Sequence, residues 1–450
     1  MKKKAALHNL GCKVNAYELE AMQQMLEQAG YDIVPFAPGA DIYIINTCTV
    51  TNIADRKSRQ MLHKAKKMNP QAVVVATGCY VQAAGEKLEK DEAIDIVIGN
   101  NKKHELLAIL DQYFASGARD DPKHNIININ QTKEYEPLTI KHTAEHTRAY
   151  LKIQDGCNQF CTYCIIPFAR GRVRSRGSED VIKEVHILAQ AGYQEIVLTG
   201  IHLSSYGVDF PGCEKSEDYP YGKALLTLIQ EIEHIEGISR VRLGSLEPGI
   251  VTEAFTKELA DCKKICPHFH LSMQSGCDET LARMNRQYDT KKFADRCQIL
   301  RKYFDDPALT TDIIVGCPGE TEEEFAKTRA FVEQINFFET HIFKYSARQG
   351  TKAAKMEHQV PDTIKASRSQ VLIELGHRHK RAYGESFIGK TVEILFEEKI
   401  EENGVSYWVG HTRRYLRAQV KTSENLTNTQ RTCMVGETNK IGTLYCEISH

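Results

Sequence analysis

The chain has 450 residues, of which 42% are hydrophobic and 26% are charged, and its formal net charge is −1. This length is too great for one ordinary core and predicts roughly two to four domains in a folded, globular protein. The near-zero charge excludes a general polyanion binder, so any nucleic-acid contact must come from local basic patches. No apolar stretch is long enough to cross a bilayer, and residues 1–8 make a poor signal peptide, so we expect a cytoplasmic protein.

Residues 1–113 alternate buried-strand and amphipathic-helix patterns, which predicts an N-terminal doubly wound α/β domain. The helical spacing of apolar residues is clearest in Glu18–Ala29 and Ala54–Lys67. The apolar runs typical of buried parallel strands are Ala5–Leu10, Asp41–Ile45, Val73–Ala76 and Ile94–Ile98.

Three cysteines of this domain, Cys12, Cys48 and Cys79, each come just after one of these strands. The carboxyl ends of parallel strands share one edge of a sheet, where ligands bind in doubly wound folds, so the three side chains could converge. A cysteine at a strand end is, however, often only a small buried residue. The spacing alone leaves both interpretations open.

Residues 114–142 are polar and contain Gly and Pro, which predicts a linker with an edge strand at Asn125–Asn130. Residues 143–375 then repeat strand and helix patterns six times, which predicts a partial (β/α)6 barrel, short of the usual eight units. The six expected strands are Tyr150–Gln154, Glu195–Thr199, Arg240–Ser245, His268–Met273, Leu309–Val315 and Thr340–Tyr345.

A CxxxCxxC run, formed by Cys157, Cys161 and Cys164, directly follows the first expected barrel strand. Three thiolates in one tight loop suit a [4Fe–4S] cluster that keeps one iron free of protein ligands. Zinc is the alternative, but a structural zinc site takes four protein ligands and no fourth Cys or His lies nearby in the sequence. Three unrelated buried cysteines are the remaining interpretation.

Four alternating arginines come after this loop: Arg170, Arg172, Arg174 and Arg176. In an extended chain they would form one charged face suited to phosphate groups. They could equally brace a network of carboxylates. Both interpretations stay open at this point.

Residues 379–449 hold five short strand patterns separated by Gly and Asn turns, which predicts a small β-barrel of the OB type. A basic stripe with an aromatic residue, Tyr415, suits RNA backbone contact and base stacking, although it could also be a solvated strand edge. The basic residues of this stripe are Arg413, Arg414, Arg417 and Lys421. We expect the eight cysteines outside the two triplets to be structural.

Together, the CxxxCxxC run with Tyr163 before its last cysteine, the N-terminal triplet and the C-terminal β module resemble the radical S-adenosylmethionine (SAM) methylthiotransferase family across nearly the whole chain. The resemblance implies a SAM-binding [4Fe–4S] cluster on Cys157, Cys161 and Cys164. It also implies an auxiliary [4Fe–4S] cluster on the N-terminal triplet and a C-terminal TRAM domain that binds RNA.

The same resemblance implies further contacts and partners. SAM would lie near Tyr163, Gly200, Gln274, Arg286 and Gly316. The partners would be tRNA and an electron donor such as flavodoxin or ferredoxin.

Branches of the family differ in substrate, and three short segments resemble the threonylcarbamoyladenosine branch: Gly11–Asn15, Asn46–Thr51 and Cys164–Pro167. The resemblance therefore implies conversion of N6-threonylcarbamoyladenosine at position 37 of tRNA, 3′ of the anticodon, to its 2-methylthio derivative. The alternatives are isopentenyladenosine tRNA or an aspartate of a ribosomal protein. An alternative of another class is a non-catalytic, metal-containing RNA-binding protein.

Overall fold

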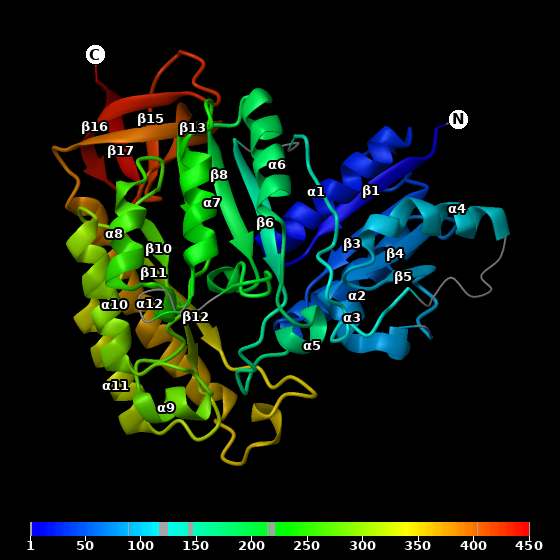
Figure 1. Ribbon diagram of the computed structural model, residues 1–450, viewed down its shortest axis with the longest axis horizontal. Helices are drawn as coiled ribbons and strands as arrows, with labels where there is room; N and C mark the ends of the chain where they lie inside the picture. Colours follow the sequence, from blue (N-terminus) through cyan, green and yellow to red (C-terminus); the bar gives the residue numbers. More distant parts are fainter. Residues whose placement is uncertain are drawn as a thin grey trace.

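The computed structural model describes residues 2–88, 90–116, 125–142, 147–213, 216, 221–402 and 404–449. Three parts are visible in Figure 1: an N-terminal α/β domain in blue, a central barrel in green and yellow, and a small C-terminal barrel in orange and red. Among the described residues, no helix is both long and apolar enough to span a membrane.

The N-terminal domain is built on a parallel sheet in the order β2-β1-β3-β4-β5. Its strands are β1 (Lys4–Asn9), β2 (Asp32–Ile33), β3 (Ile42–Thr47), β4 (Val73–Gly78) and β5 (Ile96–Ile98). Strands β3 and β4 are buried along their whole length, as their continuous apolar runs predict for a sheet covered on both faces. This confirms the doubly wound prediction, although β2 is too short for its pattern to be recognised.

Helices cover both faces of this sheet. They are α1 (Lys13–Gln28), α2 (Asn52–Met68), α3 (Cys79–Ala84) and α4 (Leu106–Ser116). Met22 of α1 shares one core with Leu110 of α4, while Leu62 of α2 shares the other with Val81 of α3. Short 3₁₀ turns at Gly85–Leu88 and Lys103–Glu105 complete the domain.

The described part of the expected linker, 125–142, is packed into the molecule. Leu138 and Ile140 are buried in the core of the central domain, and the Tyr17 hydroxyl donates a hydrogen bond to the Leu138 carbonyl at 2.8 Å. The predicted edge strand at Asn125–Asn130 is wrong, because only a single bridge joins Asn125 to Ile98 of β5. Residues 117–124 of the expected linker lie outside the described residues.

The central domain contains the six expected parallel strands in two sheets, which are joined by single bridges from Val241 to Ile265 and from Leu246 to Leu271. The strands are β6 (Arg148–Asp155), β8 (Glu195–Gly200), β9 (Arg240–Leu243), β10 (His268–His270), β11 (Ala308–Val315) and β12 (Glu339–Lys344). A two-residue strand that sequence patterns do not reveal, β7 (Arg174–Ser175), pairs antiparallel with β6. The partial barrel is thus confirmed.

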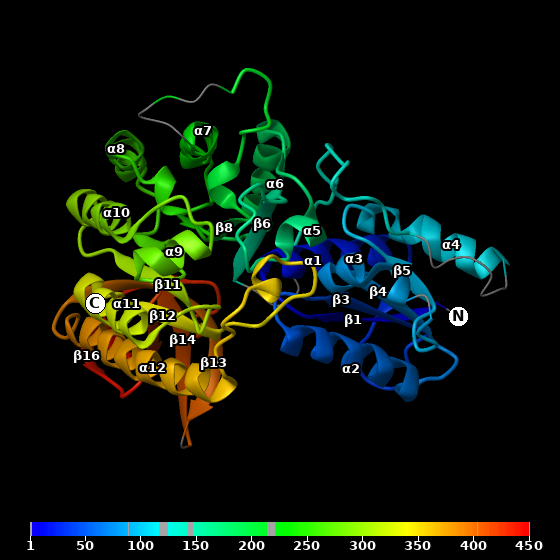
Figure 2. The same ribbon diagram turned by 90° about the horizontal axis from the view of Figure 1, so that it is seen from below.

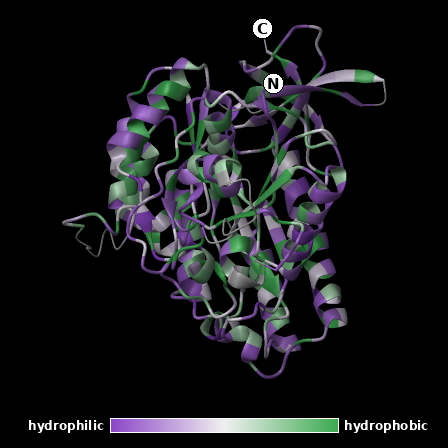
Figure 3. Cartoon of the chain, turned by 90° about the vertical axis from the view of Figure 1, so that its right-hand side faces the viewer, coloured by the Kyte–Doolittle hydropathy of each residue, from purple (hydrophilic) through white to green (hydrophobic). Residues whose placement is uncertain are grey.

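Helices line the outer side of these strands (Figure 2). They are α6 (Ser178–Gln190), α7 (Lys223–Glu233), α8 (Glu253–Asp261), α10 (Thr290–Tyr303) and α11 (Glu322–Ile335). Two short helices, α5 (Ile166–Arg170) and α9 (Asp278–Arg283), complete the domain, and α5 packs against α3 of the N-terminal domain. Leu309 and Ile313 of β11 pack against this helical layer, so the alternate residues Thr310 and Asp312 face the barrel interior. Figure 3 shows the resulting separation, with green strands crossing the middle and purple prominent at the periphery.

The C-terminal module follows α12 (Asp362–Glu385) and is a closed barrel in the order β13-β14-β15-β17-β16. Its strands are β13 (Thr391–Glu402), β14 (Val405–Thr412), β15 (Arg417–Val420), β16 (Gln430–Thr438) and β17 (Leu444–Ile448). This strand order confirms the OB-type prediction. Ala308 and Phe338 of the central domain belong to the barrel's core, so the two parts are fused rather than tethered.

Candidate functional site: two cysteine triplets

The first triplet lies at the carboxyl edge of the N-terminal sheet. Cys12 caps the start of α1, Cys48 follows β3, and Cys79 is the first residue of α3. Burial, together with a smaller effect of the neighbouring Cys79 and Cys12, raises the pKa of the Cys48 thiol to about 11, so the three groups are electrostatic neighbours. The structure therefore brings together residues spread over nearly seventy positions.

Gly78 makes the tight turn between β4 and Cys79 possible. Its φ is +97°, and a Cβ atom there would lie 2.4 Å from the Asn46 side-chain oxygen and 2.6 Å from the Thr47 carbonyl oxygen. Only glycine fits this position, because a side chain would meet fixed backbone as well as an unfavourable φ. The Cys79 sulfur accepts a hydrogen bond from Arg170 Nε at 3.0 Å and contacts Asn100 Nδ2 at 3.8 Å.

Behind Cys79 lies a buried charge network shared by the N-terminal and central domains. Arg170 contacts Glu18 and Asp155, Lys152 Nζ lies 2.7 Å from Glu18 and 2.6 Å from Asp155, and Lys103 Nζ lies 3.2 Å from Glu18. Burial alone would raise the pKa of Glu18, but Arg170, Lys103 and Lys152 lower it well below its usual range.

The network has an excess of positive charge next to a cysteine of the first triplet. Its side chains are at most 2% exposed: the cations Lys103, Lys152, Arg170 and Arg174, and the carboxylates Glu18, Glu136 and Asp155. Four cations against three carboxylates leave one positive charge.

The structure also decides between the two interpretations of the alternating arginines. Arg170 and Arg174 contact Asp155, and Arg176 pairs with Glu184, so these three brace carboxylates and the phosphate interpretation is wrong for them. The segment is not extended throughout, since α5 ends at Arg170 and β7 spans only two residues. Arg172 is exposed and stacks on the Phe160 ring at 4.4 Å.

The second triplet lies in the loop after β6, at the carboxyl end of the barrel. The Cys157 amide donates to the Gly171 carbonyl at 3.0 Å, and the Cys164 amide donates to the Cys161 carbonyl at 3.0 Å, which folds the loop on itself. Burial raises the pKa of Cys164 to about 12, and Cys161 and Cys157 contribute to that rise. The three thiols are therefore grouped in one place.

Arg286 contacts a sulfur of the second triplet, as Arg170 contacts a sulfur of the first. Its Nη1 donates to the Cys161 sulfur at 3.2 Å, and its Nε donates to the Tyr288 hydroxyl at 2.9 Å. The family resemblance implies that Arg286 lies near SAM, and in the structure Arg286 contacts a cysteine of the triplet directly. The Arg170 contact to Cys79 had no local sequence signal, because the two residues are 91 positions apart.

Two of the other expected SAM contacts also lie at the carboxyl ends of barrel strands. Gly200 ends β8, where a Cβ atom would lie 2.8 Å from the Gln154 side-chain oxygen. Gln274 has a φ of +67°, and its backbone bonds to both Asp312 and Ile314 of β11 at 2.9 Å.

The remaining two expected contacts flank the same end of the barrel. Tyr163 packs half-buried against a small cluster that includes Met284 and Cys317. Gly316 follows β11 and donates its amide hydrogen to Glu320 at 3.0 Å. A structural need explains the glycine, since a Cβ atom would lie 2.3 Å from the Lys365 side chain.

The donor sets fit iron–sulfur clusters better than single ions. Among the described residues, three candidate ligand atoms within 4.8 Å of one another occur only in His270, Asp312 and His341, and in neither cysteine triplet. A single zinc ion needs its ligands gathered around one centre, whereas a cubane takes each thiolate on a different iron. Three cysteines at each site would hold such a cluster and leave one iron open.

The basic residues of the C-terminal stripe fall into two groups, one packed against the central domain and one exposed. Arg413 donates to the Ile265 carbonyl at 2.9 Å and Arg414 donates to the Asp306 carbonyl at 2.9 Å, so both join the small barrel to the central domain. Tyr415 lies under the Arg242 guanidinium, 4.8 Å from ring centroid to Cζ, and is not available for base stacking. Arg417 and Lys421 are exposed.

The eight cysteines outside the triplets differ in exposure. Cys213 is exposed, and the other seven are buried: Cys262, Cys266, Cys277, Cys297, Cys317, Cys433 and Cys446.

Two protein families match the chain. Residues 4–99 match a family described as "Uncharacterized protein family UPF0004", and residues 151–332 match the radical SAM superfamily. Among solved structures, the radical SAM methyltransferase TsrM from Kitasatospora setae aligns with a TM-score of 0.55 at 16% identity, covering 76% of this chain and 75% of that one. This likeness supports the fold.

Sequence relatives are much closer. The threonylcarbamoyladenosine tRNA methylthiotransferase MtaB of Bacillus subtilis is 42% identical over 94% of this chain and 91% of its own length. The MtaB of Aquifex aeolicus is 40% identical over 89% of this chain and 93% of its own. A tRNA-2-methylthio-N(6)-dimethylallyladenosine synthase of Acetivibrio thermocellus is 34% identical over 92% and 84%. The chain therefore belongs to the radical SAM methylthiotransferase family.

Proposed function

We propose that this enzyme methylthiolates C2 of N6-threonylcarbamoyladenosine at position 37 of tRNA. Family membership brings SAM and [4Fe–4S] clusters as cofactors. When bound, they supply the sulfur and the radical chemistry. The contribution of the protein is to hold them, to orient the base between them and to exclude water.

The observation that carries this proposal is that the same packed elements, α1 and β6, lead to both cysteine triplets. Helix α1 directly follows Cys12 and packs against β6 and β8, and the Cys157 loop continues from β6. Arg170 spans the gap, since it bonds both Cys79 and Asp155 at the end of β6. We assign the auxiliary cluster to Cys12, Cys48 and Cys79, and the SAM-binding cluster to the CxxxCxxC loop.

The substrate is inferred from the relatives. Those with the highest identities quoted above are named for threonylcarbamoyladenosine, and the dimethylallyladenosine enzyme is less similar. Arg417 and Lys421, which stay exposed on the C-terminal barrel, are our candidates for contact with the RNA backbone.

The electron donor needs access to the second triplet. A pocket of about 400 Å³ lies beside Cys161 and Cys164 and is lined by Phe160, Phe168, Lys352 and Lys355, among others. Two lysines and exposed aromatic surface suit an acidic redox protein such as flavodoxin or ferredoxin. We place the reaction in the cytoplasm, where tRNA and such donors occur.

The test is anaerobic turnover with three tRNAs that carry threonylcarbamoyladenosine, isopentenyladenosine or plain adenosine at position 37, with nucleosides read by mass spectrometry. We expect a 2-methylthio product from the first tRNA. We expect Cys12→Ala to abolish methylthiolation while SAM cleavage persists, and Cys161→Ala to abolish both. The matched control is Cys213→Ala, which changes an exposed cysteine outside both sites. Product on the isopentenyladenosine tRNA alone would reassign the substrate.

A further inference from the structure

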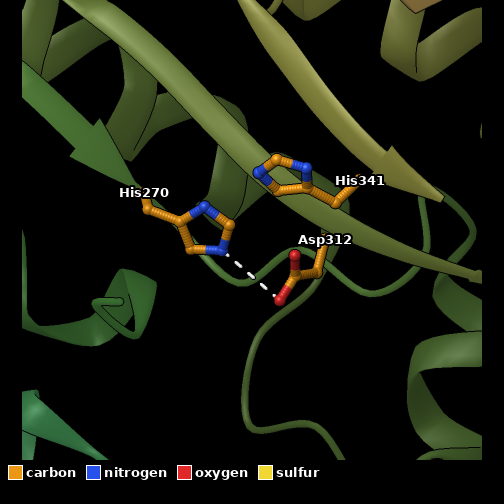
Figure 4. A group of neighbouring side chains, drawn as sticks. All are labelled: His270, Asp312 and His341. Carbon is orange, nitrogen blue, oxygen red and sulfur yellow. Dashed lines mark ion pairs between the residues drawn. The ribbon is translucent and has the colours of Figure 1, made fainter. Parts of the chain in front are cut away.

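A group of polar side chains stands on the inner wall of the central barrel, on β10, β11 and β12. His270, Asp312 and His341 come from these three neighbouring strands and point toward one another (Figure 4). Asp312 is the direct register partner of His341, and His270 pairs with Thr310. The two imidazole rings are stacked with centroids 5.8 Å apart.

The group keeps hydrogen-bonding capacity that the described part of the chain does not use. The Nδ1 of His270 is 3.0 Å from the Thr310 hydroxyl, but its buried Nε2 has no hydrogen-bond partner and lies 3.4 Å from an Asp312 oxygen. Within the described residues, the exposed ring of His341 has no hydrogen bond either. Asp312 is about a third exposed, at 32%. A buried polar atom such as Nε2 of His270 normally has a partner, and the accessible Asp312 and His341 beside it leave room for a ligand with complementary groups.

The group lies two residues along the strands from the residues that contact the cysteine loop, on the side of the strand starts. Ile314 follows Asp312 on the same face of β11 and packs against the same cluster, Met284 and Cys317, as Tyr163 of the CxxxCxxC loop. Its register partner on β12 is Phe343, which follows His341 on the same face and is 44% exposed. Two residues along a parallel strand correspond to about 6.6 Å.

Along the strands, Phe343 lies nearer the cysteine loop and the polar group lies further from it, and this order matches the positions of C2 and N6 on the adenine. An exposed aromatic ring at the level of the loop suits stacking with an adenine. In the adenine ring, N1 separates C2 from the carbon that carries N6. A base whose C2 faces the loop would therefore direct its N6 substituent toward the polar group.

Building on the proposed function, we propose that His270, Asp312 and His341 bind the threonylcarbamoyl substituent, with Phe343 stacking on the adenine. This substituent carries a carboxylate and a carbonyl, which accept hydrogen bonds from the imidazoles. Its hydroxyl and ureido N–H groups donate to Asp312. An isopentenyl substituent offers none of these groups and would leave the wall unpaired, which is the strongest form of discrimination available to a binding site.

The test compares His341→Ala and Asp312→Asn with wild type and with His186→Ala, an exposed histidine on the outer helix α6. The quantity measured is kcat/KM for methylthiolation of tRNAs with threonylcarbamoyladenosine, isopentenyladenosine or adenosine at position 37. We expect both wall variants to lower the value for the first tRNA about 10- to 100-fold, the effect of losing a hydrogen bond to a charged group. The preference for the threonylcarbamoyladenosine tRNA should fall together with kcat/KM. His341→Gln should recover part of the lost kcat/KM, and His186→Ala should match wild type.

Two results would overturn this assignment. Equal losses on all three tRNAs, with preference unchanged, would make the group structural. Stoichiometric Zn²⁺ or Co²⁺ binding to the reconstituted enzyme, lost in His341→Ala, would make it a metal site instead. The activity of the wild-type protein distinguishes failure of this inference from failure of the proposed function. If it acts on the threonylcarbamoyladenosine tRNA while the variants keep their preference, only this inference fails; if it does not, the proposed function fails first.

Discussion

At the scale of single residues, each cysteine triplet has one guanidinium in hydrogen-bonding contact with one of its sulfurs: Arg170 with Cys79 and Arg286 with Cys161. Hydrogen bonds to the sulfur ligands and nearby charge are among the factors that set the reduction potential of an iron–sulfur cluster. A positive charge on the ligand favours the reduced, more negative state of the cluster. Both arginines should therefore ease reduction.

We predict that Arg286→Gln makes the cluster on the CxxxCxxC loop harder to reduce. The variant removes the charge and keeps a polar side chain at the site. The midpoint potential, followed by EPR during an anaerobic redox titration, should become more negative, and SAM cleavage should slow. Arg172→Gln is the control, since Arg172 stacks on Phe160 near the same loop. Identical potentials in wild type and Arg286→Gln would contradict this role.

A second prediction concerns Gly156, which precedes Cys157. Its φ is +72°, and a Cβ atom would lie 1.8 Å from the Arg172 carbonyl oxygen. Gly192→Ala is the matched control, because its φ of +91° is equally unfavourable but nothing lies within 4 Å of an added Cβ. Both variants should lose about 1–2 kcal/mol from the backbone strain. Only Gly156→Ala should also lose bound iron, measured after anaerobic reconstitution, because the loop itself must move; equal iron in the two variants would contradict this.

At the scale of elements, the C-terminal barrel is anchored to the starts of the barrel strands by two buried arginines of β9. Arg242 of β9 bonds Glu195 of β8 at 2.8 Å and also donates to the Arg413 carbonyl at 2.9 Å. Arg240 pairs with Glu393 of β13 at 2.9 Å. These contacts fix the small barrel to the amino ends of the central strands, at the end of the central domain away from the cysteine loop.

Glu195 makes this anchor dependent on pH. Burial would raise its pKa, but Arg242, Arg148 and Arg240 lower it to about 2, below the ordinary 4.5. Stability from this carboxylate is thus fully present above pH 4.5 and is lost as the pH falls toward 2, since the unfolded chain takes up the proton first. Glu195→Gln should lower the free energy of unfolding by about 3 kcal/mol at pH 7, because Arg242 loses its buried partner.

The measurement is chemical unfolding of wild type and Glu195→Gln under identical conditions from pH 7 down to pH 3.5. The difference between the two proteins should stay constant above pH 4.5 and shrink below it. A difference that is the same at every pH would contradict the pair's role.

Sequence patterns predicted the elements that are long and regular. The continuous apolar runs of β3 and β4 and the periodic helices locate the sheet and the barrel, and the CxxxCxxC spacing locates one triplet without any tertiary information. The two-residue strands β2 and β7 were missed because so short a segment has no period. Their existence depends on the neighbouring strand, not on their own residues.

Properties that depend on tertiary contacts could not be read from the chain. Arg413 and Arg417 look alike in sequence, yet Arg413 bonds a carbonyl of the central domain and Arg417 is exposed. The alternating arginines were ambiguous until Asp155 and Glu184 were seen beside them. The group of His270, Asp312 and His341 has no sequence spacing at all, because three strands far apart in the chain bring it together.

At the scale of the whole molecule, two of the three parts supply the cysteine triplets, and the third is fixed to the amino ends of the central strands. The N-terminal domain contributes one triplet, the central barrel the other, and the buried network around Glu18 and Lys152 fixes the two domains against each other. The C-terminal module is fused to the barrel through Ala308 and Phe338. The central claim is therefore that one rigid frame holds two independent iron–sulfur sites at a set distance.

The measurement that tests this claim most directly is iron and sulfide content after anaerobic reconstitution. It compares wild type with Cys12/Cys48/Cys79→Ala and with Cys157/Cys161/Cys164→Ala. The account predicts about eight irons in wild type and about four in each triple variant, because each triplet holds its own [4Fe–4S] cluster. About four irons in wild type, lost entirely in one triple variant and unchanged in the other, would contradict it and leave only one cluster site.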